Sequence, residues 1–368
     1  MNSFLTEYSL SSLYKMDSGI SSSPEQAGHG YPFISFSTIF NNIILPETIV
    51  DLMDTSEKER QIYSIKCGDI LITRTSETID ELAMSSVALK DYPGATFSGF
   101  AKRLRPISSL TYPKFMAFLL RSTYFRKIVN YKAIMTLRAS FNEEIFSYIK
   151  VLLPSYDDQV KIGDFCFDIY SKKIINGKII EALEEYGEEI YDFLLSNPNL
   201  CETKKVGDLV EITTGKEFAN FGGKQGKYRF FSCSKDVLWC DQFAFDADSV
   251  IVSTHGDFHA DHVRGKFNAY TCDSVLTPFD SLERGIIYFA IKKYLPVLQK
   301  GSNGSIIKFI GKKEIMNIPV LIPNNKKLAI ELNNIICKIE NKIIENKKAN
   351  EQIDYFFPLL LNGQLKLK

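Results

Sequence analysis

The most regular hydrophobic pattern in the chain lies in two long segments. Apolar positions recur at alternating spacings of three and four residues from Ile162 to Phe193, and again from Leu332 to Phe356. A sustained period near 3.5 residues is typical of helices that pack on each other along a seam. The pattern therefore predicts two long helices, each of which is the only partner of comparable length for the other.

Both predicted seams are interrupted by the same polar residues. Lys172 and Asn176 interrupt the first, and Lys342 and Asn346 interrupt the second 170 residues later. A seam asparagine costs stability but fixes register, because it is satisfied only opposite another polar group. We predict that these four residues set the register of a helix pair, and that an antiparallel pair would separate two globular halves. The alternative is two ordinary amphipathic helices packed on separate cores.

The chain also repeats itself outside the helices. Ile149–Pro154 resembles Ile318–Pro323, and in each case an apolar strand ends in proline just before a long helical segment. Farther upstream, Cys67–Thr73 resembles Ala247–Ser253, where an aspartate enters an apolar strand that ends in hydroxyl residues. The order of elements is globular half, long helix, globular half, long helix. This order indicates a tandem duplication with diverged globular parts.

The globular halves are predicted to be mainly β. Short apolar segments such as 70–73 and 250–253 lie between glycine, asparagine and aspartate residues. One helix is predicted in each half, over residues 112–130 and 285–300. The fold class expected is α+β: two mainly-β halves and a pair of long antiparallel coiled-coil helices, related by a pseudo-two-fold repeat.

Composition narrows the class of protein. The 368 residues carry 44 basic and 44 acidic side chains, so a globally basic nucleic-acid binder is not indicated. Residues 151–200, which hold the first long helix, carry 4 basic and 10 acidic side chains, so the globular halves are free to present positive faces. Seven scattered cysteines without a CxxC motif favour reduced thiols. With no secretory signal or bilayer-length apolar stretch expected, we predict a soluble cytoplasmic protein without membrane contact.

Two motifs of enzymes that act on nucleic acids or nucleotides are missing from the sequence. There is no Pro-Pro-aromatic triplet of the kind that adenine methyltransferases use, and no GxxxxGK[ST] phosphate loop. Residues 222–227 are glycine-rich and basic, which suits either a loop near a phosphate backbone or a plain surface loop. Residues 254–262 hold three of the four histidines. They could form a DNA-facing loop, a surface loop or a metal site.

Taken together, these features resemble the specificity subunits of type I restriction–modification systems. The resemblance rests on the strand–proline–helix joints at Pro154 and Pro323, each opening a long helix with a Lys-Ile-Ile step near its middle. The segments that begin at Gly30 and Gly68 are similar to the target-recognition domains of that family. The resemblance covers essentially the whole chain. One departure is that the second joint lacks the glutamine that the first has as Gln159.

The resemblance implies a non-catalytic DNA-binding subunit that needs no cofactor and no metal. Residues 1–153 and 198–322 would be target-recognition domains, while 154–197 and 323–368 would hold the spacer helices and the C-terminal tail. Each domain would read one part of a split, asymmetric sequence in double-stranded DNA. The helices would set the spacing and bind two methyltransferase subunits, which supply adenine methylation. Two restriction motor–nuclease subunits are an optional addition.

Candidate DNA contacts are basic, polar and aromatic residues in the loops of both halves. In the resembled family, the region just before the strand that leads into each long helix approaches DNA. This adds residues near 138 and 305–308, although a plain turn before a buried strand is the alternative. The full set is His29, Tyr31, Arg74, Thr75, Ser76, Lys102, Arg103, Arg138, Lys224, Lys227, Arg229, His255, His259, Arg264, Ser305 and Lys308.

Two other functions compete with DNA reading. One is a metal-dependent nuclease centred on His255, His259 and His262, which stoichiometric zinc or manganese in the purified chain would favour. The other is a coiled-coil scaffold whose globular ends bind protein, which co-purification of a partner without DNA affinity would favour.

Overall fold

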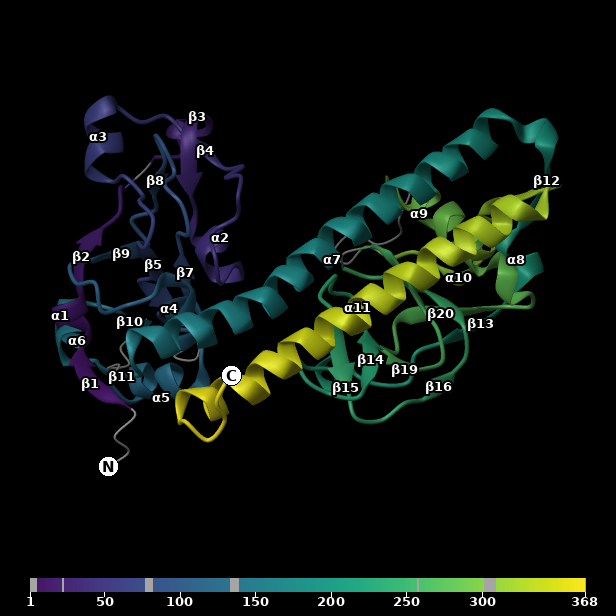
Figure 1. Cartoon of the computed structure of the whole chain (residues 1–368). Coiled ribbons are helices and arrows are strands. Elements are labelled where there is room, and N and C mark those ends of the chain that lie inside the picture. The colour runs from purple at the N-terminus through teal and green to yellow at the C-terminus, as the bar shows by residue number, and fades with distance from the viewer. Residues whose placement is uncertain are drawn as a thin grey trace. The chain divides into compact units, whose positions relative to one another are not determined.

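The chain folds into two compact units. The computed structural model describes residues 5–21, 23–76, 82–132, 139–256, 258–300 and 309–367. Unit 1 comprises residues 1–172 and 348–368, and unit 2 comprises residues 173–347. The long helices α7 (Tyr156–Ser196) and α11 (Lys326–Leu361) each contribute to both units (Figure 1). Within the described part of the chain, no helix has both the length and the apolar character needed to cross a bilayer.

Unit 1 combines short strands with short helices before α7 begins. Its strands are β1 (Thr6–Ser9), β2 (Tyr14–Ser18), β3 (Ala27–Ile34), β4 (Leu52–Met53), β5 (Ile70–Thr73), β6 (Thr75–Ser76), β7 (Ser85–Val87), β8 (Thr96–Phe97), β9 (Ala101–Pro106), β10 (Ala139–Ser140) and β11 (Lys150–Leu153). Its helices before α7 are α1 (Leu10–Leu13), α2 (Phe36–Asn41), α3 (Glu57–Ile62), α4 (Pro113–Leu119), α5 (Thr123–Lys132) and α6 (Glu143–Tyr148).

Unit 2 follows the same plan between the two long helices. Its strands are β12 (Cys201–Lys205), β13 (Val210–Thr214), β14 (Tyr228–Phe231), β15 (Leu238–Cys240), β16 (Phe245–Asp246), β17 (Ser249–Ser253), β18 (Ala260–Val263), β19 (Lys266–Ala269), β20 (Asp273–Pro278) and β21 (Pro319–Pro323). Its short helices are α8 (Val206–Leu209), α9 (Arg284–Lys300) and α10 (Lys312–Met316).

The sheets of the two units have matching strand orders. Unit 1 has a four-stranded sheet in the order β2-β9-β5-β7, and unit 2 has one in the order β13-β20-β17-β18. Each unit also pairs two strands in parallel, β3 with β8 and β14 with β19. The first strand of each unit pairs antiparallel with the strand that enters the long helix, β1 with β11 and β12 with β21. This correspondence confirms the predicted duplication and the α+β class.

The ladder registers show which residues are equivalent. In unit 1, Ile70 lies opposite Val87 on one side and Leu104 on the other. In unit 2, Val250 lies opposite His262 and Leu276 in the same way. His262 therefore occupies the position of Val87, a difference that matters for how each sheet meets the long helices.

Each long helix begins where the sequence places a cap. Ser155 follows Pro154, and its Oγ accepts a hydrogen bond from the backbone N–H of Asp158 at 3.2 Å. At the second joint, Oδ1 of Asn325 accepts one from the N–H of Lys327 at 3.1 Å. Gln159 is 2 % exposed and bonds to the carbonyls of Leu110 and Pro154. The missing second glutamine thus removes a local loop contact and leaves the helix intact.

In unit 2 the two long helices run antiparallel and pack on each other. The end of α7 meets the start of α11, because β12 follows the first helix and pairs with β21, which precedes the second. Farther along, Nδ2 of Asn176 donates a hydrogen bond to Oδ1 of Asn346 at 3.0 Å. Asn176 is 2 % exposed, and it also donates to Glu345 at 3.2 Å. Lys342 forms an ion pair with Glu345 at 3.2 Å on its own helix.

The buried stripe of α7 differs in part from the predicted seam. Ile179, Tyr186 and Phe193 are 37 %, 48 % and 51 % exposed, whereas Ile190 and Leu194 are buried in the core of unit 2. The stripe follows the 3.6-residue period of a straight helix because α7 packs on α9 as well as on α11. The prediction was wrong for those three positions.

In unit 1 the long helices share one core with the sheet and with α4. Phe165 of α7 packs edge-to-face on Phe356 of α11, with ring centroids 5.9 Å apart. A Cβ added at Gly163 would lie 2.7 Å from the backbone nitrogen of Phe115, so α4 crosses α7 closely at this glycine. Unit 2 makes the equivalent crossing with the glycine on the other helix, since Gly285 of α9 lies against the backbone of α11.

The helix predicted over residues 112–130 is two helices. α4 ends at Leu119 and α5 begins at Thr123, because Ser122 caps the second helix by accepting a hydrogen bond from the N–H of Phe125 at 3.3 Å. The helix predicted over residues 285–300 is present as α9.

Candidate nucleic-acid interface

The loop that follows the central strand of unit 1 is joined to the segment before α6. Strand β6 pairs antiparallel with β10, and the N–H of Phe141 donates to the carbonyl of Arg74 at 2.7 Å. The N–H of Arg74 donates to the carbonyl of Phe100 at 2.8 Å. We call residues 74–76, Phe100 and 139–140 loop site 1. Arg74 is exposed, so its guanidinium is available to an external anion or base edge.

Unit 2 builds the same junction from different side chains. His255 forms an antiparallel bridge with Phe309, and the N–H of Ile310 donates to the carbonyl of Thr254 at 3.0 Å. The rings of His255 and Phe309 stack with centroids 6.0 Å apart. We call residues 254–256, 258–259 and Phe309 loop site 2. In both units the site therefore combines the loop after the central strand with the segment that precedes the last short helix.

Two candidate residues of unit 2, Arg229 and His259, meet around one carboxylate. Asp261 lies 3.4 Å from Nη2 of Arg229 and 3.4 Å from Nε2 of His259. Burial opposes ionisation of this carboxyl, but the hydrogen bond from His259 and the charge of Arg229 outweigh burial and lower the pKa of Asp261. The guanidinium of Arg229 also lies over the ring of Phe231 at 4.4 Å. Asp261 thus holds the guanidinium of Arg229 and the imidazole of His259 in fixed positions, with 11 % and 15 % of these side chains exposed.

Lys102 and Arg103 lie inside unit 1, each 5 % exposed. The ammonium of Lys102 pairs with Glu143 at 3.0 Å, and the guanidinium of Arg103 pairs with Asp17 at 2.9 Å. Both charges are satisfied within the unit because β9 is a central strand of the sheet, with β2 and β5 on its two sides. Neither side chain therefore presents its charge on the surface of the unit.

The remaining described candidates lie on other surfaces of their units. His29 and Tyr31 are exposed on β3, and the guanidinium of Arg60 stacks on the Tyr31 ring at 3.6 Å. Lys224 and Lys227 are exposed near Gly226, whose carbonyl accepts a hydrogen bond from Lys347 of α11.

Arg264, also exposed, bonds to Asn341 of α11 at 3.4 Å. Arg138, Ser305 and Lys308 lie outside the described residues.

The histidine cluster is divided between two environments. His255 stacks on Phe309, whereas the ring of His262 is 3 % exposed and its Nδ1 lies 2.9 Å from Glu340 of α11. Among the described residues, no group of three or more His, Cys, Asp or Glu side chains is placed to hold a metal ion. The nuclease alternative therefore finds no support.

Sequence reasoning missed Phe100, which is 62 % exposed on a firmly held turn. The N–H of Gly99 donates to the carbonyl of Ile20 at 2.7 Å, and the N–H of Ala101 donates to the carbonyl of Ser98 at 2.9 Å. The Ser-Gly-Phe triplet was a usable signal, since it marks a turn at the entrance of a strand.

Comparison with known proteins places the first half of the chain beside a known domain. Residues 8–185 match the model of the type I restriction modification DNA specificity domain. A stretch of 143 residues is 29 % identical to the type I restriction enzyme EcoDI specificity subunit of Escherichia coli. It covers 38 % of this chain and 32 % of that protein, about a third of the relative's length.

A solved structure shows the same fold over the whole chain. The type I restriction–modification S subunit from M. genitalium superimposes with a TM-score of 0.59 at 14 % identity. The match covers 100 % of this chain and 98 % of that chain.

Proposed function

We propose that the chain is the non-catalytic DNA-reading subunit of a methyltransferase or restriction complex, and that it recognises a split, asymmetric sequence in double-stranded DNA. One observation carries the proposal. Loop sites 1 and 2 have the same backbone frame but different side chains, with Arg74 and Thr75 in one and Thr254 and His255 in the other. The same backbone arrangement with different side chains suits two domains that read different bases.

The side chains at the two sites fit base-edge and phosphate contacts. An arginine such as Arg74 can donate two hydrogen bonds to O6 and N7 of guanine, and hydroxyl groups can contact several bases. Arg229 and His259, held by Asp261, offer donors from a fixed position in unit 2. The exposed Lys224 and Lys227 suit phosphate contacts, which position a protein without specifying sequence. We assign target recognition to residues 1–153 and 198–322.

The long helices are proposed to bind two methyltransferase subunits that carry out adenine methylation. Ile174 of α7 and Ile344 of α11 are equivalent in the duplication, and they are 43 % and 44 % exposed. Two similar apolar positions on paired helices suit two copies of one partner. Restriction motor–nuclease subunits, two in number, are the optional addition.

Selection from random double-stranded DNA tests the proposal. The full chain should enrich a two-part motif with a fixed gap, and affinity should fall as salt rises because phosphate contacts release counterions. The Arg74→Ala variant should lose about 1–3 kcal/mol of discrimination at positions of one part only. His255→Ala should relax the other part, and Lys150→Ala, a surface control that breaks the pair with Glu7, should change neither. An ungapped motif, or no enrichment, would overturn the proposal.

Methylation mapping tests the partnership. Adenine methylation at the selected motif should disappear from the source genome when this gene is deleted, and should return when it is restored. Methylation that persists at the same motif without the gene would contradict the proposed role.

A further inference from the structure

A buried group of charged and polar side chains joins the sheet of unit 2 to its helices. Oε1 of Glu340 on α11 lies 2.9 Å from Nδ1 of His262 on β18 and 2.9 Å from Nη1 of Arg284 on α9. The guanidinium of Arg284 also donates to the carbonyl of Val263. On α9, the hydroxyl of Tyr288 donates to Glu184 of α7 at 3.0 Å. We call His262, Arg284, Tyr288, Glu340 and Glu184 the anchor cluster.

The anchor cluster is placed where ionised groups are costly. Arg284, His262, Tyr288 and Glu340 are 1 %, 3 %, 4 % and 6 % exposed. Burying ions costs several kcal/mol each, in round numbers, unless hydrogen bonds and charges compensate, and well-packed apolar residues are often as stabilising. Burial raises the pKa of Glu340, but hydrogen bonds and charges from His262 and Arg284 outweigh burial and lower it. The carboxylate of Glu340 is therefore compensated, whereas Nε of Arg284 is buried without a hydrogen-bond partner among the described residues. Stability alone thus does not explain why the cluster is ionic.

Among its described residues, unit 1 has no buried ionic cluster at the equivalent positions; its ion pair between α4 and α7, Lys114 with Asp164 at 2.7 Å, is partly exposed. Val87 stands in the ladder position of His262 and is fully buried. Tyr170 stands in the helix position of Glu340, and its ring packs edge-to-face on Phe118 with centroids 6.1 Å apart. The attachment of the sheet to the helices is thus mainly apolar and aromatic in unit 1.

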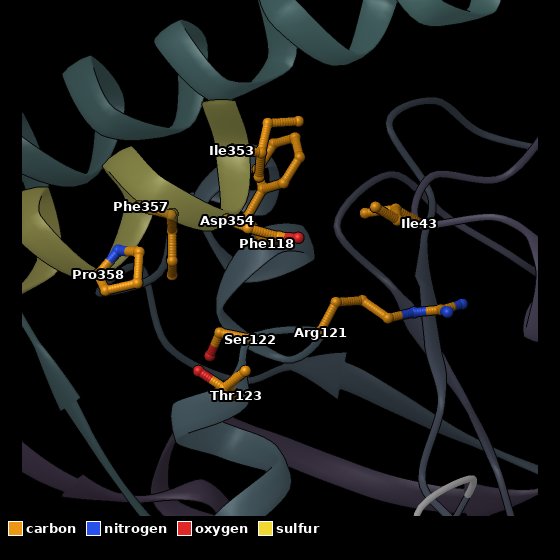
Figure 2. A pocket seen from close by; sticks show the side chains of 9 residues that line it. All are labelled: Ile43, Phe118, Arg121, Ser122, Thr123, Ile353, Asp354, Phe357 and Pro358. Atoms are coloured by element: carbon orange, nitrogen blue, oxygen red, sulfur yellow. The ribbon is translucent and has the colours of Figure 1, made fainter. Parts of the chain in front are cut away.

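A basic residue near the helix that crosses the long helices also has different partners in the two units. In unit 2, Lys292 of α9 pairs with Glu184 at 2.6 Å. In unit 1, the side chain of Arg121, just after α4, extends toward the segment around Ile43 (Figure 2) and donates to the carbonyls of Ile39 and Asn42. A pocket of about 140 Å³ remains beside it, lined by Phe118, Ile353, Phe357 and Pro358 among others.

The two kinds of attachment constrain geometry differently. Apolar packing is non-directional, so a sheet held by it can rotate or slide slightly with little loss of contact. Hydrogen bonds between ions depend on angle and distance. When such a network loses one partner, the remaining buried charge is uncompensated, and this strongly destabilises the folded state. The anchor cluster therefore fixes one orientation of the unit 2 sheet against its helices. Loop site 2 follows β17, the neighbour of β18, so its position is fixed as well.

We propose that the anchor cluster is a positioning device that sets the gap length accepted between the two parts of the DNA sequence. The inference rests on the proposed function, because it requires DNA with two separated parts. One added base pair moves the second part by about 3.4 Å along the DNA and about 35° around it. With the unit 2 sheet fixed, the apolar attachment of unit 1 alone would have to absorb that displacement, and a slight movement of one sheet is too small for it. With apolar attachments in both units, the two sheets share the displacement.

The test replaces the anchor cluster with apolar residues of similar size, as His262→Leu, Arg284→Met and Glu340→Leu together. Such replacements commonly preserve folding. Wild-type chain and variant are each used to select from random double-stranded DNA. The wild type should return one gap length. The variant should return the same bases in each part with additional gap lengths. The variant's preference for the wild-type gap length over a gap one base pair longer should fall by about tenfold. This factor corresponds to a coupling energy in the middle of the range for residues of one hydrogen-bond or ion-pair network.

A milder variant and a matched control complete the experiment. Tyr288→Phe removes only the hydrogen bond to Glu184. It provides the test if the triple variant fails to fold, and it should also widen the range of gap lengths that is selected. Lys293→Met removes an exposed pair with Asp192 between the same two helices, and should leave the gap unchanged. A folded variant that keeps a single gap length would overturn the positioning role. A wild type that returns no gapped motif would instead overturn the proposed function.

Discussion

Asp273 is a buried carboxyl whose charge state should control the pH dependence of unit 2. It begins β20 opposite Ser253, directly beside loop site 2, and is 0 % exposed. Sγ of Cys233 lies 3.8 Å from its Oδ1, while none of the described residues donates a hydrogen bond to its Oδ2. Burial is the main cause that raises the pKa of Asp273 to about 7.

The direction of the effect follows from proton uptake. In the unfolded chain the carboxyl titrates near pH 4, whereas in the folded chain it keeps its proton to about pH 7. Stability is therefore fully present below pH 4 and is lost as the pH rises to 7, because only the unfolded chain gains by releasing the proton. Three pKa units at about 1.4 kcal/mol each give an upper value of about 4 kcal/mol.

The Asp273→Asn variant should lack this loss. Its free energy of unfolding relative to wild type should increase by up to about 4 kcal/mol between pH 4 and pH 7.5, and then stay constant. Urea unfolding followed by the emission of Trp239, the single tryptophan, measures this in unit 2. Asp246→Asn, an exposed control, should follow the wild-type curve. Parallel curves for wild type and Asp273→Asn would refute a raised pKa at this carboxyl.

Two further predictions concern the long helices. Asn346→Leu should destabilise unit 2 by about 1–3 kcal/mol, because it takes a partner from the buried amide of Asn176. Adding Asn176→Leu should recover most of that loss by apolar packing, and a double-mutant cycle in urea would show whether the residues are coupled. Gly163→Ala should destabilise unit 1 by about 1–3 kcal/mol, since its Cβ would meet backbone. Gly177→Ala on the same helix, with open space around its Cβ in the described structure, should stabilise by about 0.5–1 kcal/mol in thermal unfolding.

The sequence predicted best what depends on local pattern. The long apolar periods and the capped joints at Pro154 and Pro323 indicated α7 and α11, because helix formation is read from spacing and from a few end signals. The matching segments 67–73 and 247–253 indicated equivalent strands. The exposed Ile179 was misassigned because the sequence does not show that a third helix, α9, also packs on α7.

Side-chain roles were harder to predict because they depend on partners distant in sequence. Lys102 and Arg103 have the residue types of DNA contacts, and only their pairing with Glu143 and Asp17 reveals that they are interior charges. Likewise, His262 belongs to a histidine-rich stretch, but its partner Glu340 is 78 residues away. Charge and spacing locate a candidate loop, while burial decides which of its side chains face outward.

The sheet of unit 2 is attached to the long helices by an ionic cluster, and the sheet of unit 1 mainly by apolar packing. This difference affects how a duplicated chain can diverge. The loop sites can change residue by residue, because Arg74 and His255 lie on frames held by backbone hydrogen bonds. The anchor cluster cannot change in that way, since Glu340 without His262 and Arg284 would be a buried charge without compensation. Placing the unit 2 sheet on the helix segment of Tyr170 would leave the buried His262 without the carboxylate of Glu340. New specificities are therefore expected to arise first in the loops, and a transfer of the whole unit 2 sheet should succeed only when Glu340 is transferred with it.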